Sequence, residues 1–282
     1  MHKIVVITHK HELYDSYLLF EILRELQRRG YATEVVKGVP QNAPDGDVGV
    51  LHVDTTFTPP EYLTYARSFP FCVNVGTPDI SKRTISGARL RPGEDWMGPV
   101  IVKSNLNCGG LPEARLNRLA EASGYAPPFP NLCELQSYTV YDSLVDVPQS
   151  ALEDETLFVE KFIPEEDPDG YVLRVWTFCG DNEQCSRCVS PERLVKGANV
   201  VRRALVSVPE ELRARRAELG FDYGKFDFVI HDGKAVLLDA NRTPSMPPRC
   251  AADRTKYFAD GFEGLIRSWI PRRRYLGRFF AR

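Results

Sequence analysis

The sequence predicts a mixed α/β protein in which a parallel α/β unit precedes a mainly antiparallel sheet. Apolar runs alternate with amphipathic helical segments over residues 1–80, which is the pattern of a parallel α/β unit. From residue 137 to residue 241, segments rich in β-branched and aromatic residues follow one another with little helix between them, which favours an antiparallel sheet. The 282 residues are 43% hydrophobic and 26% charged, and they suit two or three subdomains around a shared core.

The N-terminal elements follow from their apolar spacing. Residues 3–8, KIVVIT, form a continuous apolar run, as expected of a strand buried on both faces. Over residues 14–30 the apolar side chains recur at helical spacing, and Gly30 fits the end of that helix. Further strands are predicted over residues 31–36, 47–54 and 71–75, with a helix over residues 59–69.

The rest of the chain is predicted in the same way. Residues 99–105, PVIVKSN, predict a strand that enters a glycine-containing loop and a helix over residues 106–123. The three prolines of residues 126–131 mark a surface loop. Strands are predicted over residues 137–144, 156–163, 171–181, 183–189 and 200–208 and in a hairpin over residues 225–241, and late helices over residues 209–219 and 258–270.

Charge and cysteine content narrow the class of protein. The net charge of −2 gives no general attraction for nucleic acid, and we read the arginine-rich residues 272–282 as a solvated or docked terminus. No stretch approaches the roughly 20 apolar residues of a membrane helix, so no membrane partner is expected. Seven cysteines without framework spacing indicate free thiols in a reducing cytoplasm.

The hairpin over residues 225–244 carries Asp227, Asp239 and Asn241 on strands that are otherwise apolar. Side chains alternate between faces along a strand, so Asp239 and Asn241 share a face. Two carboxylates and an amide oxygen on one face can bind a hard cation such as Mg²⁺ that keeps positions open for phosphate oxygens. The alternative is a solvated face with scattered acids.

The position of Asp227 depends on the length of the turn. A two-residue turn at Asp232 and Gly233 would place Asp227 on the other face from Asp239. A three-residue loop that begins at His231 would place both acids on one face. The sequence His-Asp-Gly suits the three-residue loop, with a left-handed glycine after a type I turn, and this is the form that we expect.

Two other stretches have residues suited to a nucleotide. Lys103 ends an apolar strand before a loop that contains Gly109 and Gly110, and backbone amides of such a loop can cradle phosphate oxygens. The loop matches neither the Walker pattern nor the dinucleotide-binding pattern, and the alternative is a plain turn beside a solvent-directed lysine.

In the second stretch, strand 156–163 ends in an acidic loop and the chain returns through Arg174. Phe162 and Ile163 can offer an apolar slot and backbone groups to a purine ring. Acids of residues 165–167 can accept hydrogen bonds from ribose hydroxyls, and Arg174 can contact a phosphate with two hydrogen bonds. The alternative is an exposed hairpin with an acidic tip.

Together, and in this order, these stretches resemble the ATP-grasp superfamily, and most of all its carboxylate–amine ligases of the RimK and glutathione synthetase type. The shared pattern is a lysine on a strand before a glycine-containing loop, a hinge like VEKFIPE, an arginine-bearing return strand and a final DFV…LLDANRTP. The resemblance covers roughly residues 80–250. It implies an N-terminal α/β subdomain over residues 1–95, a small ATP-grasp subdomain over residues 96–160 and a large one over residues 161–282, with the nucleotide sandwiched between the last two.

The resemblance also implies roles for individual residues. Asp227, Asp239 and Asn241 would hold one or two Mg²⁺ ions on the ATP phosphates; most members carry glutamate where Asp239 stands. The implied nucleotide contacts are Lys82, Lys103, Gly109, Gly110, Glu160, Lys161, Phe162, Ile163, Glu166, Asp167 and Arg174. The implied catalytic residues are Lys103, Arg174 and Arg242, with Thr243 beside Arg242 at the substrate end.

The implied activity is an ADP-forming ligation. A carboxylate would be activated by ATP as an acyl phosphate and attacked by an amine, and the substrates would be small molecules or peptides. Two alternatives stay open: a small-molecule kinase on the same scaffold, and a non-catalytic nucleotide-binding protein. His9, His11, Asn105 and Asn107 are further candidates for substrate contacts, and an oligomer is possible.

Overall fold

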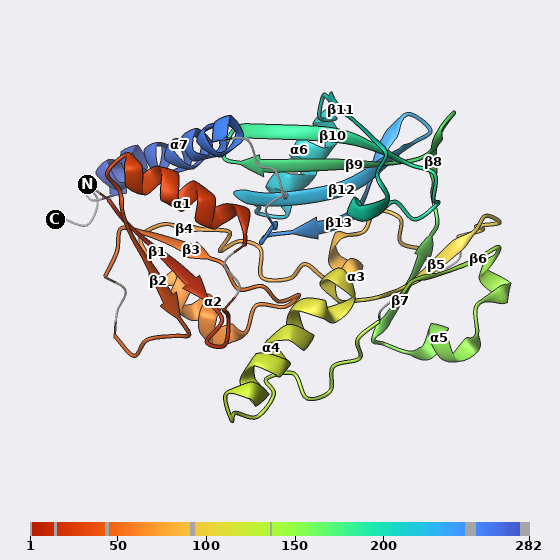
Figure 1. Ribbon diagram of the computed structural model, residues 1–282, viewed down its shortest axis with the longest axis horizontal. Coiled ribbons are helices and arrows are strands. Elements are labelled where there is room, and N and C mark those ends of the chain that lie inside the picture. Colours follow the sequence, from red (N-terminus) through yellow and green to blue (C-terminus); the bar gives the residue numbers. More distant parts are fainter. Residues whose placement is uncertain are drawn as a thin grey trace.

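The computed structural model describes residues 2–13, 16–42, 45–90, 94–135, 137–245 and 252–276. Three sheets follow one another along the chain, and Figure 1 shows the first at the lower left, the second at the lower right and the third above it. This arrangement confirms the predicted class, a parallel α/β unit followed by antiparallel sheets. The arginine-rich residues 277–282 lie outside the described residues.

The first sheet is parallel, with the strand order β2-β1-β3-β4. Its central strands are apolar runs buried on both faces, as their composition predicts. β4 spans only two residues of the run predicted as a strand. The elements of this unit are β1 (Lys3–Thr8), α1 (Leu18–Arg28), β2 (Ala32–Lys37), β3 (Val48–Leu51), α2 (Pro60–Arg67) and β4 (Cys72–Val73).

The second sheet is antiparallel, with the order β6-β5-β7. A four-residue helix, α3, lies between the first two sheets, in a segment where the sequence predicted no helix. The elements of this part are α3 (Lys82–Ile85), β5 (Val100–Ser104), the 3₁₀ turn η1 (Asn107–Gly110), α4 (Leu111–Ala122), β6 (Thr139–Tyr141), the 3₁₀ turn η2 (Leu144–Asp146), α5 (Gln149–Glu153) and β7 (Leu157–Lys161).

The third sheet has the order β11-β10-β9-β12-β13. β8 pairs with the first three residues of β9. Apolar side chains of β9, β12 and β13 pack against α6 on one face, so the other face is left to meet the second sheet. The elements are β8 (Glu165–Asp167), β9 (Gly170–Cys179), β10 (Asn182–Ser190), the 3₁₀ turn η3 (Gly197–Asn199), β11 (Arg202–Val206), α6 (Glu210–Glu218), β12 (Tyr223–His231), β13 (Lys234–Asn241) and α7 (Ala252–Leu276).

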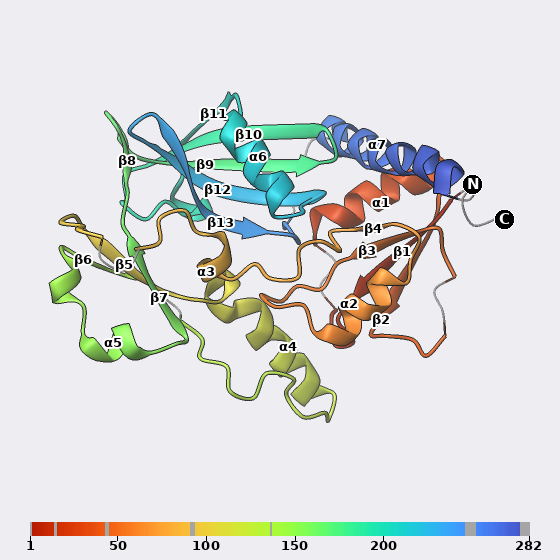
Figure 2. The same ribbon diagram turned by 180° about the vertical axis from the view of Figure 1, so that it is seen from behind.

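The last helix returns to the first unit. α7 lies beside α1 in both views (Figures 1 and 2). Phe258 and Phe262 of α7 share a buried cluster with Ile4 of β1 and Leu19 of α1. The N-terminal sheet therefore has part of its core supplied by the C-terminal end of the chain. Within the described residues, no helix is both long and apolar enough to span a membrane.

The hairpin turn differs from the prediction. His231 pairs with Lys234, so the turn has two residues, Asp232 and Gly233. Their φ angles are +50° and +74°, as in the type I′ turn, whose twist matches that of the flanking strands. The expected three-residue loop is therefore wrong.

The two acids nevertheless share a face, because a β-bulge lies nearer to the site. The register shifts between Asp227 and Phe228, so Asp227 lies opposite Asp239 while Phe228 lies opposite Leu237. Leu238 is the extra residue of the bulge and reverses the alternation of faces. The acids are thus direct cross-strand neighbours rather than the diagonal pair that a three-residue loop would give.

Candidate nucleotide and metal site

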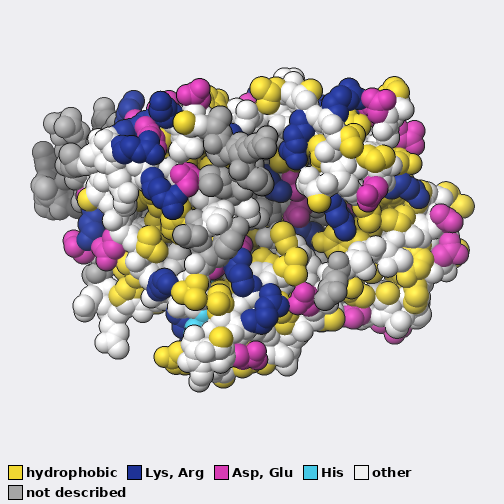
Figure 3. Space-filling view, viewed as in Figure 1, with side chains coloured by type: hydrophobic (Ala, Val, Ile, Leu, Met, Phe, Trp, Pro, Cys, Tyr) yellow, Lys and Arg dark blue, Asp and Glu magenta, His cyan; other side chains and the backbone are white. Residues whose placement is uncertain are grey.

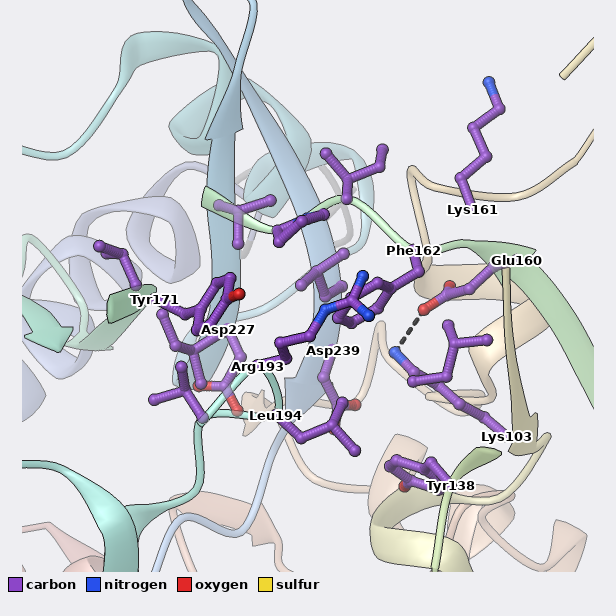
Figure 4. Close-up of a pocket in the computed structure, with 18 of the residues that line it drawn as sticks. Lys103, Tyr138, Glu160, Lys161, Phe162, Tyr171, Arg193, Leu194, Asp227 and Asp239 are labelled. Atoms are coloured by element: carbon purple, nitrogen blue, oxygen red, sulfur yellow. Dashed lines mark hydrogen bonds and ion pairs between the residues drawn. The ribbon is translucent and has the colours of Figure 1, made fainter. Parts of the chain in front are cut away.

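A cavity lies where the second sheet meets the third, and Figure 4 shows the side chains that line it. Its volume is about 170 Å³, below the roughly 300–1,000 Å³ of most ligand pockets, so a ligand of ordinary size would require its walls to separate. The predicted site residues that line it are Lys103, Glu160, Lys161, Phe162, Ile163, Asp227 and Asp239. The fold therefore joins the strand before the glycine loop, the hinge and the hairpin.

One part of the cavity is an apolar slot. Its wall includes Ile101, Phe162, Val172, Val229 and Leu238. The guanidinium carbon of Arg193 lies 4.9 Å from the centre of the Phe162 ring, and Figure 4 shows Arg193 reaching over that ring. A flat apolar slot covered by a cation suits an aromatic ring that carries phosphate groups.

A buried ion pair joins Lys103 of β5 to Glu160 of β7 (Figure 4). Glu160 is fully buried, and its second carboxylate oxygen accepts a hydrogen bond from the hydroxyl of Ser86. A buried carboxylate is costly unless it is paired, so Glu160 holds the ammonium of Lys103 at the cavity wall. Lys103 also lies over the ring of Tyr138, 5.8 Å from its centre.

In the predicted hinge, residues 160–163, two backbone N–H groups already donate hydrogen bonds within the protein. The backbone N–H groups of Lys161 and Phe162 donate to the carbonyls of Ala88, at 3.0 Å, and Pro99, at 2.9 Å. The side chain of Lys161 points away from the other labelled side chains and pairs with Glu94 (Figure 4). Lys161 therefore offers backbone rather than its ammonium group to the cavity.

The two acids of the hairpin each face a lysine. Asp227 Oδ2 lies 2.9 Å from the ammonium of Lys225, and Asp239 is paired with Lys82 of α3. Burial opposes the charged form of both lysines, but the neighbouring carboxylates more than offset it, and the pKa of each lysine is raised. The site therefore combines two negative and two positive side chains, a set that can bind both a divalent cation and phosphate oxygens.

One oxygen atom of this set is suited to coordinate a metal ion. Asp227 Oδ1 is buried and has no hydrogen-bond partner among the described residues, which is costly unless a ligand completes it. Asn241 is less available as a metal ligand, because its side-chain oxygen accepts a bond from the Thr243 N–H, at 2.7 Å, and lies 2.9 Å from the Thr243 hydroxyl oxygen. In the described part of the chain, no group of three or more His, Cys, Asp or Glu side chains is arranged to hold a metal ion.

Arg174 lies on the other face of the third sheet. It is opposite Phe228 in the neighbouring strand, and Phe228 packs in the core beneath α6. Its guanidinium binds Glu165 through two nitrogens, at 2.9 and 2.7 Å. The structure therefore does not bring Arg174 to the cavity that holds Asp227.

The acids predicted at the ribose are also outside the lining. Asp167 accepts hydrogen bonds from Arg187, at 2.7 Å, and Arg202, at 2.8 Å, and Glu166 is exposed. Because both oxygens of the Asp167 carboxylate accept bonds from these arginines, Asp167 links strands within the third sheet.

The glycine loop turns back on its own chain. Cys108, Gly109 and Gly110 are all left-handed, with φ of +48°, +68° and +85°. A Cβ on Gly109 would lie 2.5 Å from the carbonyl oxygen of Leu135, so this glycine permits a close backbone approach. Neither glycine lines the cavity between the second and third sheets.

Arg242 is fully buried and joins the hairpin to the first unit. Its guanidinium donates to the carbonyls of Val53, Thr55 and Thr77. Burial lowers the pKa of Arg242 to about 10, so the group remains charged at neutral pH. These contacts make Arg242 a link between the hairpin and the N-terminal unit, and it does not line the cavity between the second and third sheets.

Its neighbour Thr243 leads to a second polar network. The Thr243 hydroxyl donates to Asp54, which follows β3. The other oxygen of Asp54 accepts bonds from the Tyr17 hydroxyl, at 2.8 Å, and from Arg115, at 3.1 Å. This network places charged groups at the carboxyl end of the parallel sheet, where ligands of α/β folds bind.

The two predicted histidines are not part of that network. His9 is buried against Tyr62, with ring centres 5.7 Å apart, and burial together with His11 and Lys10 lowers its pKa to about 4. It lines a separate cavity with Tyr62 and Phe129. A neutral, stacked imidazole of this kind stabilises packing more readily than it transfers protons.

Three cations of the site were not predicted from the sequence. Arg193 and Lys196 line the cavity from the segment after β10, and Lys225 precedes the hairpin acids. On the face seen in Figure 3, Lys and Arg side chains lie on both halves of the molecule, and apolar side chains are denser on the right. Of these three cations, only Lys225 could have been predicted from the sequence. It lies two residues before Asp227 on the same strand, so the two side chains share a face.

Solved structures resemble this fold along nearly its whole length. A D-alanine–D-alanine ligase from Bacillus anthracis superposes with a TM-score of 0.55 at 13% identity, covering 96% of this chain and 98% of that one. The same enzyme complexed with ATP gives 0.51 at 13% identity, covering 98% and 99%. An ATP-grasp RimK domain protein from Sphaerobacter thermophilus gives 0.51 at 14% identity, covering 91% and 97%. No protein-family model matches the sequence, and no curated protein sequence is similar enough to count as a match.

Proposed function

Because the chain has the ATP-grasp fold, we propose that it is an ATP-dependent ligase that joins a carboxylate to an amine through an acyl phosphate. The observation that carries this proposal is the cavity between the second and third sheets. Its apolar slot suits an adenine ring, and the Asp227, Asp239, Lys82 and Lys225 cluster suits a triphosphate with a divalent cation.

Asp227 and Asp239 are the residues that would hold Mg²⁺. The unpartnered Oδ1 of Asp227 supports this, and the ion would neutralise charge on the phosphate oxygens. With the carboxylates engaged in this way, Lys82 and Lys225 are free to turn towards phosphate oxygens. Asn241 would join the set only by giving up its bonds to Thr243.

In the proposed reaction, an oxygen of the substrate carboxylate attacks the γ-phosphorus of ATP and the bond to ADP breaks. The amine nitrogen then attacks the acyl carbon, phosphate leaves, and the nitrogen loses its proton. Such chemistry depends mainly on positioning and charge neutralisation. Lys103 supplies a cation held in place by Glu160, and Arg193 supplies one that covers the slot.

The reacting groups of the substrates would meet beside the hairpin acids. Asn241, Thr243 and Asp54 form a continuous path from those acids to the carboxyl end of the parallel sheet. We therefore assign the substrates, small molecules or peptides, to the region between the first sheet and the hairpin.

Isotope transfer tests this reaction. The protein is incubated with Mg-ATP and a panel of ¹⁸O-labelled amino acids and amines, and ADP, phosphate and products are followed by mass spectrometry. A ligase releases ADP only when an acid and an amine are both present, and one ¹⁸O passes from the carboxylate to the phosphate. A stable phosphorylated product that forms without the amine would identify a kinase instead. ATP binding without turnover across the panel would favour a non-catalytic protein.

A further inference from the structure

A second cavity, which we call the Glu113 pocket, is lined in part by Asn105 and Leu106, just before the glycine loop, and is distinct from the nucleotide cavity between the second and third sheets. Its volume is about 460 Å³, within the range of small-molecule sites. Its apolar wall includes Phe57, Leu106, Phe129 and Leu132. Phe57 is 48% exposed, so its ring is available to contact a ligand in this pocket.

The charged groups of this pocket have one sign. Among its lining residues, Glu113 and Glu155 are acidic, and no Lys, Arg or His belongs to the lining. A pocket with apolar walls and a net negative charge favours a ligand that carries a positive charge on an apolar body.

Glu113 itself lacks a partner on one side. Its side chain comes from the first turn of α4 and is 3% exposed. Oε1 accepts a bond from the Thr56 N–H at 2.6 Å, whereas Oε2 is buried and meets no hydrogen-bond donor in the part of the chain that the structure describes. Burial raises the pKa of Glu113. A donor that carries positive charge would satisfy the free oxygen and stabilise the carboxylate.

The Glu113 pocket adjoins the proposed reaction site. Lys103 lines the nucleotide cavity, and Asn105, two residues later, lines the Glu113 pocket. The carbonyl of Asn105 accepts a bond of 3.0 Å from the N–H of Lys82, the lysine paired with Asp239. The two cavities are therefore separated by little more than one strand end.

We propose that the Glu113 pocket binds the amine substrate, a primary amine on a compact apolar body, with its ammonium group on Glu113 and its apolar part against Phe57 and Phe129. The assignment of this ligand as a substrate rests on the proposed ligase function. The binding site itself does not depend on it.

Phenethylamine is the probe that tests the site, and 2-phenylethanol is its neutral counterpart. Both are titrated into the full chain by calorimetry or ligand-observed NMR. The wild type is expected to bind phenethylamine about tenfold or more tightly than the alcohol. Glu113→Gln is expected to remove that preference, a loss of about 10- to 100-fold for the amine alone. Glu121→Gln is the matched control, because Glu121 is exposed on the same helix and does not line the pocket.

A second variant keeps the test decisive if Glu113→Gln does not fold. Phe57→Ser removes an exposed wall of the pocket and is expected to weaken both probes. Equal affinity of the wild type for the two probes, or unchanged affinities in Phe57→Ser, would overturn the proposal. Mg-ATP is titrated into the same samples: intact nucleotide binding without amine preference defeats this inference alone, and amine preference without nucleotide binding defeats the ligase proposal alone.

Discussion

At the scale of single residues, His52 shows the cost of a buried polar group. It is 1% exposed, and neither ring nitrogen has a hydrogen-bond partner within the described residues. Its ring meets that of Tyr17 edge to face, with centres 4.6 Å apart. Burial, with Arg242 and Arg115, lowers its pKa to about 3. No pattern in the sequence indicated this, because a histidine after an apolar strand reads equally well as a loop residue.

His52 predicts a loss of stability in acid. The unfolded chain binds a proton near pH 6.5 and the folded chain only near pH 3, so stability falls as pH drops from about 6.5 towards 3. By pH 5 the loss is about 2 kcal/mol from this residue. His52→Leu should remove that part of the acid dependence in denaturant unfolding at pH 7.5 and pH 5. His231→Leu, at a half-buried side chain next to the β12–β13 turn, is the control and should leave the dependence as in the wild type. An unchanged dependence in His52→Leu would contradict the account.

At the scale of elements, regular patterns were predictable and irregular ones were not. The continuous apolar run of β1 is confirmed at residues 3–8, and the helix predicted over residues 14–30 is confirmed over residues 18–28. The four-residue α3 was missed, because a single turn leaves no periodicity to read. The bulge at Leu238 was missed for a related reason: it comes from how β13 pairs with β12, and an alternating strand gives no local sign of it.

The bulge predicts the effect of a one-residue deletion. Removing Leu238 takes out only the extra residue, so the two-residue turn is kept and Asp227 stays directly opposite Asp239 on one face. We expect Mg-dependent ATP binding to survive in this variant. Leu238→Ala keeps the bulge and trims the same apolar wall, so both variants should bind with about tenfold lower affinity. Calorimetry of both variants decides the point, and loss of the Mg²⁺ effect in the deletion variant alone would contradict the pairing of the two acids as the feature that forms the site.

At the scale of the whole molecule, the units are joined more closely than their order in the chain suggests. α7 completes the core of the N-terminal sheet, and Arg242 ties the end of β13 to the loops after β3 and β4. The sequence did predict which stretches come together, since Lys103, Glu160 and Asp227 line one cavity. It predicted Arg174 and Arg242 as catalytic residues, because a sequence motif does not show whether an arginine faces a ligand or the protein interior.

Arg242 predicts coupling between these units. Arg242→Lys leaves buried carbonyls without donors and should lower the free energy of unfolding by about 3 kcal/mol. Thermal unfolding checks this, with Arg267→Lys as the control, because Arg267 is an exposed residue of α7. A variant as stable as the wild type would show that the buried guanidinium does not hold the units together.

The central claim is that Asp227 and Asp239 hold a divalent cation on the phosphates of ATP. Titration of ATP into the protein with and without Mg²⁺ tests it most directly. The wild type should bind ATP more tightly with Mg²⁺, and Asp227→Asn and Asp239→Asn should each lose most of that difference. Asp167→Asn, whose carboxylate is held by Arg187 and Arg202, should behave as the wild type. Mg²⁺-independent binding in the wild type, or an undiminished Mg²⁺ effect in Asp227→Asn, would contradict the account.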